Sequence, residues 1–238
     1  MEPGERVLEI GPGPGGLTRT LLEAGARVWA LEADPRMVAH LEAQGLPHLH
    51  LLHADALEVD YEELARGAGG PFRLVANLPY NISGPLIARL LRQRRAFVSM
   101  TVMLQREVAE RLLAPPGGRD RGRLSVLTQC FCVPRSLFRV APGSFRPPPK
   151  VDSRVVRLDV RPRPPIPLSD EDALWTVVRA GFARRRKMLR NSLRALAGDL
   201  DRVLEAAGVS GRERAEDLEV GQWIALANAW AARETKGE

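Results

Sequence analysis

The start of the chain alternates short apolar runs with helix-forming stretches, and this alternation restricts the fold more than any other feature. The run "RVLEI" (6–10) predicts a buried strand, and "GPGPGG" and a helical pattern over 17–26 follow it. The same order repeats with "RVWALEAD" (27–34) and "PRMVAHLEAQG" (35–45), in which Asp34-Pro35 is typical of a helix start. Strands that alternate with helices favour a parallel sheet with helical crossovers, so the sequence predicts an α/β fold.

The alternation continues until a proline-rich stretch, "RPRPPIPL" (161–168), which is typical of a linker. Beyond it the pattern is helical to the end. We therefore expect two domains, 1–163 and 164–238, within the 238 residues. A helix is expected over 84–94, and further strands over 49–57, 72–80, 96–105, 124–133 and 153–160.

Charge is distributed unevenly along the chain. Residues 1–76 carry 6 arginines and lysines against 12 acids, 77–163 carry 17 against 5, and 164–238 carry 12 against 12. An acidic first third and a strongly basic middle predict that a polyanion binds on one side of the molecule. No apolar run is long enough to span a bilayer and no secretion leader precedes the first strand, so we expect a cytoplasmic protein without membrane contact.

The glycine loop predicts a site for a ligand that contains adenosine. Gly11, Gly13 and Gly16 fit G-x-G-x-x-G between a strand and a helix, and Glu32 ends the next strand. This arrangement suits both a dinucleotide and S-adenosylmethionine. Two details favour the methyl donor. Glu9 is placed to reach a cationic amino acid tail, and the loop prolines remove N–H groups that a pyrophosphate needs. A third acid, Asp55, ends the third strand, where it can accept a hydrogen bond from an adenine amino group.

The stretch "VANLPYNIS" (75–83) predicts methylation of an exocyclic amine. Such an amine is a poor nucleophile until it becomes pyramidal. The side-chain carbonyl of Asn77 and the backbone carbonyl of Leu78 can hold its hydrogens out of the ring plane. Pro79 fixes the backbone, and Tyr80 offers a face on which a flipped base can stack.

Cysteines and histidines predict no metal site. Cys130 and Cys132 are expected to be two small core residues on one strand. His48, His50 and His53 lack the spacing and the nearby acids that a metal requires, and solvent-facing positions beside a strand are expected for them.

Taken together, the motifs resemble the family of ribosomal RNA adenine N6,N6-dimethyltransferases of the KsgA type. The likeness extends from about residue 5 to about residue 228. Its marks are "EIGPGPGGLT", "ALEAD", "HADAL", "VANLPYNIS", "SFRPPPKVDSRVVRL", "FARRRKMLRNSL" and "RAEDL", of which the last three are the most specific.

The resemblance implies a Rossmann-like, class I, S-adenosylmethionine-dependent methyltransferase domain followed by a small C-terminal α-helical domain. The implied activity is N6-dimethylation of two adjacent adenines near the 3′ end of small-subunit ribosomal RNA, with a role in subunit maturation, by a monomer. The family's donor contacts fall on Gly11, Glu32, Asp55 and Asn77, and its second base-stacking aromatic falls on Phe182.

One family feature has no counterpart in this sequence. Members usually carry an N-terminal segment ending in a Gln-Asn/His-Phe-Leu motif that closes over the donor. Here Met1 lies only a few residues before the first strand, so either the given sequence starts after that segment or the protein lacks it. This difference bears on donor affinity more than on the fold.

The stretch 179–194 carries seven cations and no acid, with Phe182 near its start. We expect a cation-rich helix that positions RNA phosphates beside a flipped base. Its candidate RNA-binding residues are Arg184, Arg185, Arg186, Lys187 and Arg190.

Two other interpretations stay open at this point. One is a large-subunit ribosomal RNA adenine N6-methyltransferase of the macrolide-resistance type, which shares Asn-hydrophobic-Pro-aromatic. The other is a non-catalytic RNA-binding assembly factor on the same fold. A nicotinamide enzyme is disfavoured because nothing in the sequence resembles hydride-transfer residues.

Overall fold

The computed structural model describes residues 2–184, 186–196 and 199–234, and the chain divides into two compact units. The first comprises Met1–Ala109 and Val133–Val160, and the second comprises Glu110–Cys132 and Arg161–Glu238. The second unit thus includes a segment from the middle of the chain as well as everything after Val160. The expected division at 163/164 stays a prediction about functional domains, and the contact-based units differ from it in this middle segment.

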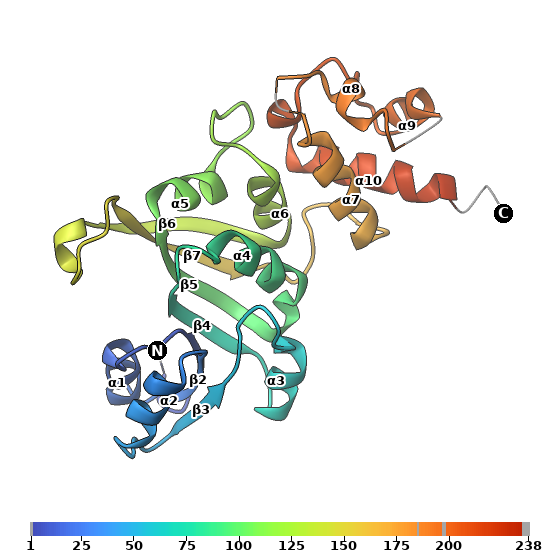
Figure 1. Ribbon diagram of the computed structural model, residues 1–238. Coiled ribbons are helices and arrows are strands. Elements are labelled where there is room, and N and C mark those ends of the chain that lie inside the picture. Colours follow the sequence, from blue (N-terminus) through green and yellow to red (C-terminus); the bar gives the residue numbers. More distant parts are fainter. Residues whose placement is uncertain (1, 185, 197–198, 235–238) are drawn as a thin grey trace. The chain divides into compact units, whose positions relative to one another are not determined.

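A seven-stranded sheet forms the centre of the first unit, in the order β3-β2-β1-β4-β5-β7-β6 (Figure 1). Adjacent strands from β3 to β5 are parallel, and β7 pairs with β5 in the antiparallel direction. The chain order reverses between β1 and β4, which is where ligands bind in open α/β sheets. The strands are β1 (Arg6–Ile10), β2 (Arg27–Glu32), β3 (Leu49–His53), β4 (Phe72–Asn77), β5 (Phe97–Gln105), β6 (Cys132–Val140) and β7 (Ser153–Val160).

Helices connect the strands and continue to the end of the described chain. They are α1 (Gly16–Glu23), α2 (Pro35–Glu42), α3 (Tyr61–Gly67), α4 (Ser83–Arg92), η1 (Arg94–Ala96), α5 (Arg106–Leu113), α6 (Arg123–Phe131), η2 (Pro142–Ser144), α7 (Glu171–Gly181), α8 (Leu189–Leu193), α9 (Leu200–Ala206), η3 (Ala215–Asp217) and α10 (Val220–Glu234). Among the described residues, no helix combines the length and the apolar character needed to cross a membrane.

The parallel part of the sheet follows the predicted pattern because its helices are amphipathic. Leu21 of α1 packs with Val7, Val28 and Ala30 of the strands in one buried cluster. The start of α2 also agrees with the prediction, since the side chain of Asp34 accepts a hydrogen bond from the backbone N–H of Arg36. The local sequence is therefore sufficient to place these elements.

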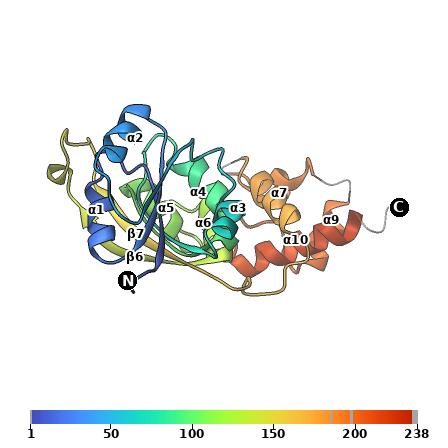
Figure 2. The same ribbon diagram turned by 90° about the horizontal axis from the view of Figure 1, so that it is seen from below.

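The last two strands of the sheet lie side by side in both views, and the loop that joins them projects from the left edge of the first unit (Figures 1 and 2). This loop, residues 141–152, includes η2 and the proline run "RPPPK". Its position matters because it returns the chain toward the carboxyl end of β4, as described below.

The expected strand over 124–133 is wrong. This segment forms α6, and only Cys132 and Val133 belong to a strand, β6, which the sequence did not predict. The apolar, β-branched run favours a strand, but α6 is buried on nearly every side, and the apolar pattern of such a helix cannot be told from that of a buried strand. Cys130 and Cys132 are buried, as expected of core residues, although they belong to different elements.

A buried arginine joins three segments of the second unit. Arg121, which is 1% exposed, donates hydrogen bonds to the carbonyl of Ala114 (2.9 Å), the side chain of Gln129 (3.0 Å) and the carbonyl of Leu218 (3.0 Å). Burial lowers the pKa of this guanidinium. These bonds to oxygen acceptors compensate for much of the lost hydration, although Nε of Arg121 is buried without a hydrogen-bond partner among the described residues, so we assign Arg121 a structural role in this unit.

Candidate functional site at the carboxyl end of the sheet

The glycine loop after β1 adopts backbone angles that only glycine tolerates well. Gly11, Gly13 and Gly15 have φ values of 68°, 54° and 84°. A Cβ on Gly15 would meet Cδ2 of Leu41 at 2.6 Å, whereas a Cβ on Gly16 would meet nothing within 4 Å. Gly15 therefore makes the close approach to the second helix, and Gly16 begins α1. The loop turns sharply and leaves its backbone accessible.

Glu32 ties this loop to the end of β2. One carboxylate oxygen accepts from the backbone N–H of Gly13 at 3.0 Å, and the other accepts from the backbone N–H groups of Ala33 and Asp34 at 2.9 Å each. A carboxylate offers about four acceptor positions, so Glu32 retains capacity for a ribose hydroxyl. Glu32 therefore fixes the conformation of the glycine loop in addition to lying beside it. The sequence alone did not indicate this structural role.

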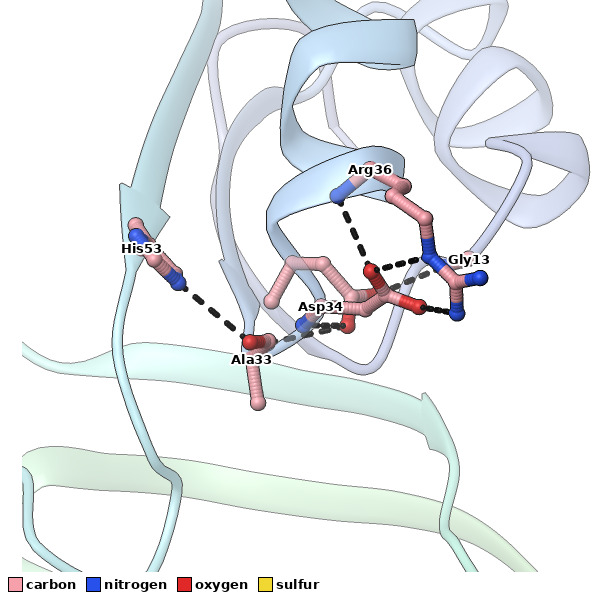
Figure 3. A network of polar contacts seen from close by, with 6 residues as sticks. Gly13, Ala33, Asp34, Arg36 and His53 are labelled. Carbon is pink, nitrogen blue, oxygen red and sulfur yellow. Dashed lines mark hydrogen bonds and ion pairs between the residues drawn. The ribbon is translucent and has the colours of Figure 1, made fainter.

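The next residues fix the start of α2. Asp34 accepts from the backbone N–H of Arg36 and also pairs with its guanidinium at 2.7 Å (Figure 3). The hydrogen bonds from Arg36 lower the pKa of Asp34 to about 2. His53 lies within 3.3 Å of the carbonyl of Ala33, so the end of β3 is held against the same turn.

Glu9 is a buried acid beside the glycine loop. It is 1% exposed and accepts a hydrogen bond of 2.7 Å from the hydroxyl of Thr18. Burial raises the pKa of Glu9 to about 7, the Thr18 bond opposes the rise, and the nearby charge of Glu32 adds to it. Sequence reasoning did not identify Thr18, whose only signal is its position on the first turn of α1.

Asp55 lies just beyond β3 and is exposed. One of its carboxylate oxygens accepts from the backbone N–H of Leu57 at 2.8 Å. The other is free of that turn, so Asp55 can still accept from a ligand. Its role as an adenine contact stays a prediction.

Asn77 is the last residue of β4, and the residues after it form one wall of a pocket. Its register partner on β5 is Met103, whose carbonyl accepts from the backbone N–H of Leu78 at 3.2 Å. Leu78 is buried and Asn77 is exposed. A Cβ placed on Gly11 would lie 3.8 Å from Cγ of Pro79, so the glycine loop and this motif are neighbours. The pocket measures about 230 Å³ and is lined by Asn77, Leu78, Pro79, Tyr80, Phe145, Pro147 and Pro149.

The other lining residues of this pocket, Phe145, Pro147 and Pro149, come from the loop between β6 and β7. The sequence of this loop is part of the resemblance to the methyltransferase family, but it did not predict a role for the loop residues. Tyr80 is also linked to the beginning of β7, because its hydroxyl lies 2.6 Å from Oγ of Ser153. These contacts join segments about 70 residues apart, so no local pattern could have predicted them.

The cation-rich stretch is not the continuous helix that the sequence predicted. The helix α7 ends at Gly181, residues 182–184 and 186–187 form turns and bends, and α8 begins at Leu189. Arg186 has a φ of 69°, a left-handed angle that interrupts a helix. On a helix, Arg184 and Lys187 would be three residues apart and would repel each other, which favours the turn.

The predicted RNA-binding residues lie in and after this turn. Arg184, Arg186, Lys187 and Arg190 are all exposed, and Arg190 also pairs with Asp201 at 2.7 Å. Arg185 lies outside the described residues. In the same unit, a pocket of about 470 Å³ is lined by Arg119, Asp120, Arg121, Arg186 and Glu216. This surface therefore combines several cations with two acids.

Phe182 lies in the second unit and stacks on Trp223, with ring centroids 5.5 Å apart and an interplanar angle of 23°. It is partly exposed. Its predicted role as a second stacking face for the target base stays a prediction.

The three clustered histidines are exposed, as expected, and His50 stacks on Trp29 with ring centroids 4.5 Å apart. Within 2–184, 186–196 and 199–234, no three histidine, cysteine, aspartate or glutamate side chains come together in a way that could hold a metal ion.

With this geometry established, comparison with known proteins identifies relatives along almost the whole chain. The family model "Ribosomal RNA adenine dimethylase" matches residues 1–232. Two proteins named "Ribosomal RNA small subunit methyltransferase A" are close relatives. The one from Phenylobacterium zucineum is 48% identical over 232 residues, which are 97% of this chain and 80% of that protein. The one from Pseudomonas aeruginosa is 47% identical over 230 residues, or 96% and 85%.

Solved structures show the same architecture. A dimethyladenosine transferase from Plasmodium falciparum matches with a TM-score of 0.79 and 27% identity, over 98% of this chain and 92% of that one. The 23S rRNA methyltransferase ErmE matches with a TM-score of 0.68 and 28% identity, over 97% and 93%. The expected class I methyltransferase fold is thereby confirmed.

Proposed function

Because this chain belongs to the ribosomal RNA adenine dimethylase family, we propose that it dimethylates N6 of two adjacent adenines near the 3′ end of small-subunit ribosomal RNA. The methyl donor in this proposal is S-adenosylmethionine. The observation that carries the proposal is the pocket at the end of β4, where Asn77, Leu78, Pro79 and Tyr80 lie beside Gly11 of the glycine loop.

The residues around the glycine loop fit such a donor. A Cβ on Gly13 would meet nothing within 4 Å, so the space beside this turn is open. Glu32 and Asp55 offer acceptors to hydroxyl and amino groups, and Glu9 offers a carboxylate to a cationic tail. When bound, S-adenosylmethionine supplies an electrophilic methyl group on a sulfonium.

The residues at the end of β4 prepare the adenine amine. The Asn77 side-chain carbonyl and the Leu78 backbone carbonyl accept its two hydrogens, which orients the nitrogen lone pair out of the ring plane. Pro79 restricts the backbone between these acceptors and the aromatic ring. Tyr80 supports the base by stacking. No general base is needed in this scheme, because the amine becomes acidic only after methylation.

The similarity to ErmE keeps a large-subunit ribosomal RNA substrate in view as an alternative. The higher identity to the small-subunit relatives, 48% against 28%, supports the small-subunit substrate. We also propose that the protein acts as a monomer, in the cytoplasm, on an assembling small subunit. The basic turn of the second unit supplies phosphate contacts in this proposal.

The first prediction tests the chemistry through Asn77→Ala. Removing one preorganised acceptor typically lowers the rate about a hundred- to a thousandfold. Asn77 is exposed at a strand end, so we expect thermal unfolding and RNA affinity to stay close to those of the wild type. The measurement is single-turnover methyl transfer to unmethylated small subunits, with mono- and dimethyladenosine counted separately.

Two outcomes separate the function from its mechanism. No methylation of small subunits by the wild type would contradict the proposed function. Near-normal dimethylation by Asn77→Ala would contradict the role of Asn77 and favour another way of activating the amine.

A further inference from the structure

Tyr80 is held at both ends by buried serines. Its hydroxyl lies 2.6 Å from Oγ of Ser153, and its backbone carbonyl accepts from Oγ of Ser83 at 3.1 Å. Ser153 is 0% exposed and Ser83 is 2% exposed. A buried hydroxyl without a partner is costly, so each serine stabilises this arrangement by satisfying its own hydrogen bond with Tyr80.

The two serines belong to rigid elements of the first unit. Ser153 is the first residue of β7 and pairs with Gln105 of β5 in the antiparallel register. Ser83 is the first residue of α4. The tip of the tyrosine ring is therefore attached to the sheet, and its backbone is attached to the start of a helix.

These two hydrogen bonds restrict rotation of the Tyr80 ring about χ1, and stacking on a base requires that the ring stay in one position. A tyrosine ring without a partner at its tip can rotate about χ1 and leave the position over the base. A hydrogen bond at the hydroxyl restricts that rotation before the substrate arrives, which lowers the entropy lost on binding. Asn77 and Tyr80 line one pocket and must act on one adenine, so the ring has to stay in register with the amide.

The partner of the hydroxyl also restricts its chemistry. Ser153 is neutral, and its hydroxyl is the partner that the structure gives to the phenol. Tyr80 is thus placed as a support, and its hydroxyl is committed to holding the ring.

We propose that Ser153 is a positioning residue for methyl transfer, which holds Tyr80 as a fixed stacking platform for the target adenine. The inference rests on the proposed function and adds a residue that acts through Tyr80 rather than on the substrate. The second methylation depends on the platform most, because a bulkier monomethylated amine must be presented to Asn77 in the same geometry. A loosened ring should therefore raise the proportion of monomethyladenosine.

The test is a double-mutant cycle with Ser153→Ala, Tyr80→Phe and the combined variant. Each single variant removes one partner of the same hydrogen bond, so each should slow single-turnover transfer about three- to tenfold and raise the monomethyl fraction. The combined variant should be no slower than either single one. Tyr80→Phe also guards the test against misfolding of Ser153→Ala, because it breaks the same bond at the residue that is only partly buried.

Ser99→Ala is the matched control. Ser99 is a serine of β5 that is also buried, at 2% exposed, and its hydroxyl lies 3.5 Å from the Arg73 guanidinium, outside the pocket. We expect this variant to transfer methyl groups at the wild-type rate with a wild-type product ratio. Rate losses in the two single variants that multiply in the combined variant would overturn the proposal, because they would show that the two residues act separately.

A spectroscopic measurement tests the hydrogen bond between Ser153 and Tyr80 without measuring methyl transfer. The chain has two tyrosines, so 3-fluorotyrosine labelling gives two ¹⁹F resonances, and Tyr80→Phe assigns them. Ser153→Ala should shift the Tyr80 resonance and leave that of Tyr61 unchanged, and Ser99→Ala should shift neither. An unshifted Tyr80 resonance in Ser153→Ala would overturn the anchor even if the wild type methylates. Absence of methylation by the wild type would contradict the proposed function alone.

Discussion

Glu9, a proposed contact of the methyl donor, is a buried acid that lowers the stability of the fold when it ionises. The fold buries its carboxyl group and gives it one hydrogen bond, from Thr18, so the pKa of Glu9 rises to about 7. The folded state therefore binds this proton more tightly than the unfolded chain does. Stability from this group is complete below about pH 4.5, declines as the pH rises, and reaches its lower limit above about pH 7.

Glu9→Gln should remove this decline, because an amide accepts from Thr18 without ionising. Relative to the variant, the wild type should lose about 3 kcal/mol of unfolding free energy between pH 4.5 and pH 7. Urea unfolding of both proteins at pH 5 and pH 8 measures the difference, and other titrating groups cancel in the comparison. Parallel changes in the two proteins would contradict a raised pKa for Glu9.

For single residues, hydrogen bonds between neighbours in the sequence were predictable, whereas hydrogen bonds between residues far apart in the sequence were not. The Asp34 cap of α2 follows from a few adjacent residues, and it is where the sequence placed it. Gly13 and Glu32 were identified as candidate ligand contacts, but the hydrogen bond between them emerges only when two strands pair. The same applies to Ser153 and Tyr80, which are 73 residues apart.

Helices were predictable from the sequence where one face of the helix packs against the core and the other is exposed to solvent. The helix α4 shows this contrast, with Leu86, Ile87, Leu90 and Leu91 buried on one face. The helix α6 lacks it, because its buried residues form one almost unbroken run, Ser125, Val126, Leu127, Thr128, Cys130 and Phe131. When every side chain is buried, hydrophobic periodicity disappears and only tertiary packing decides between helix and strand.

Gly181 provides a test of packing between elements of the second unit. It is the last residue of α7, and a Cβ at this position would collide with the ring of Trp223 and lie 3.2 Å from Cδ1 of Leu189. Trp223 is 0% exposed, so it has little room to move. We expect Gly181→Ala to reduce the free energy of unfolding by about 1–3 kcal/mol through overpacking.

The matched control for this prediction is Gly221→Ala in α10, where a Cβ would meet nothing within 4 Å. In an open helical position, alanine should be neutral or stabilise by up to about 1 kcal/mol. Thermal and urea unfolding of both variants provide the comparison. Equal stability of Gly181→Ala and the wild type would mean that the contact between α7 and Trp223 is looser than described.

For the whole molecule, the sequence shows the uneven charge distribution, but it did not predict the backbone conformation that presents the cations. The cations of 179–194 were expected on one cation-rich helix. Of these cations, Arg184, Arg186 and Lys187 lie between α7 and α8 instead, and all three are exposed. A turn presents cations at several angles, which suits contacts to phosphates that follow a curved backbone. Arg190 differs, because its partner Asp201 compensates part of its charge.

Reversing Arg184, Arg186 and Lys187 to glutamate should therefore weaken RNA binding and reduce its salt dependence. Each lost phosphate contact lowers the slope of log K against log salt by about 0.7–0.9, so three contacts account for a change of about 2–3. Affinity for the methyl donor should not change, because the proposed donor contacts belong to the first unit.

The control is Arg202→Glu, an exposed arginine of α9 outside the turn, which should leave the slope close to that of the wild type. Titration of a small-subunit RNA fragment at several salt concentrations measures both variants. A slope that the triple reversal leaves unaltered would show that these cations are only solvated surface residues and that phosphate binding lies elsewhere.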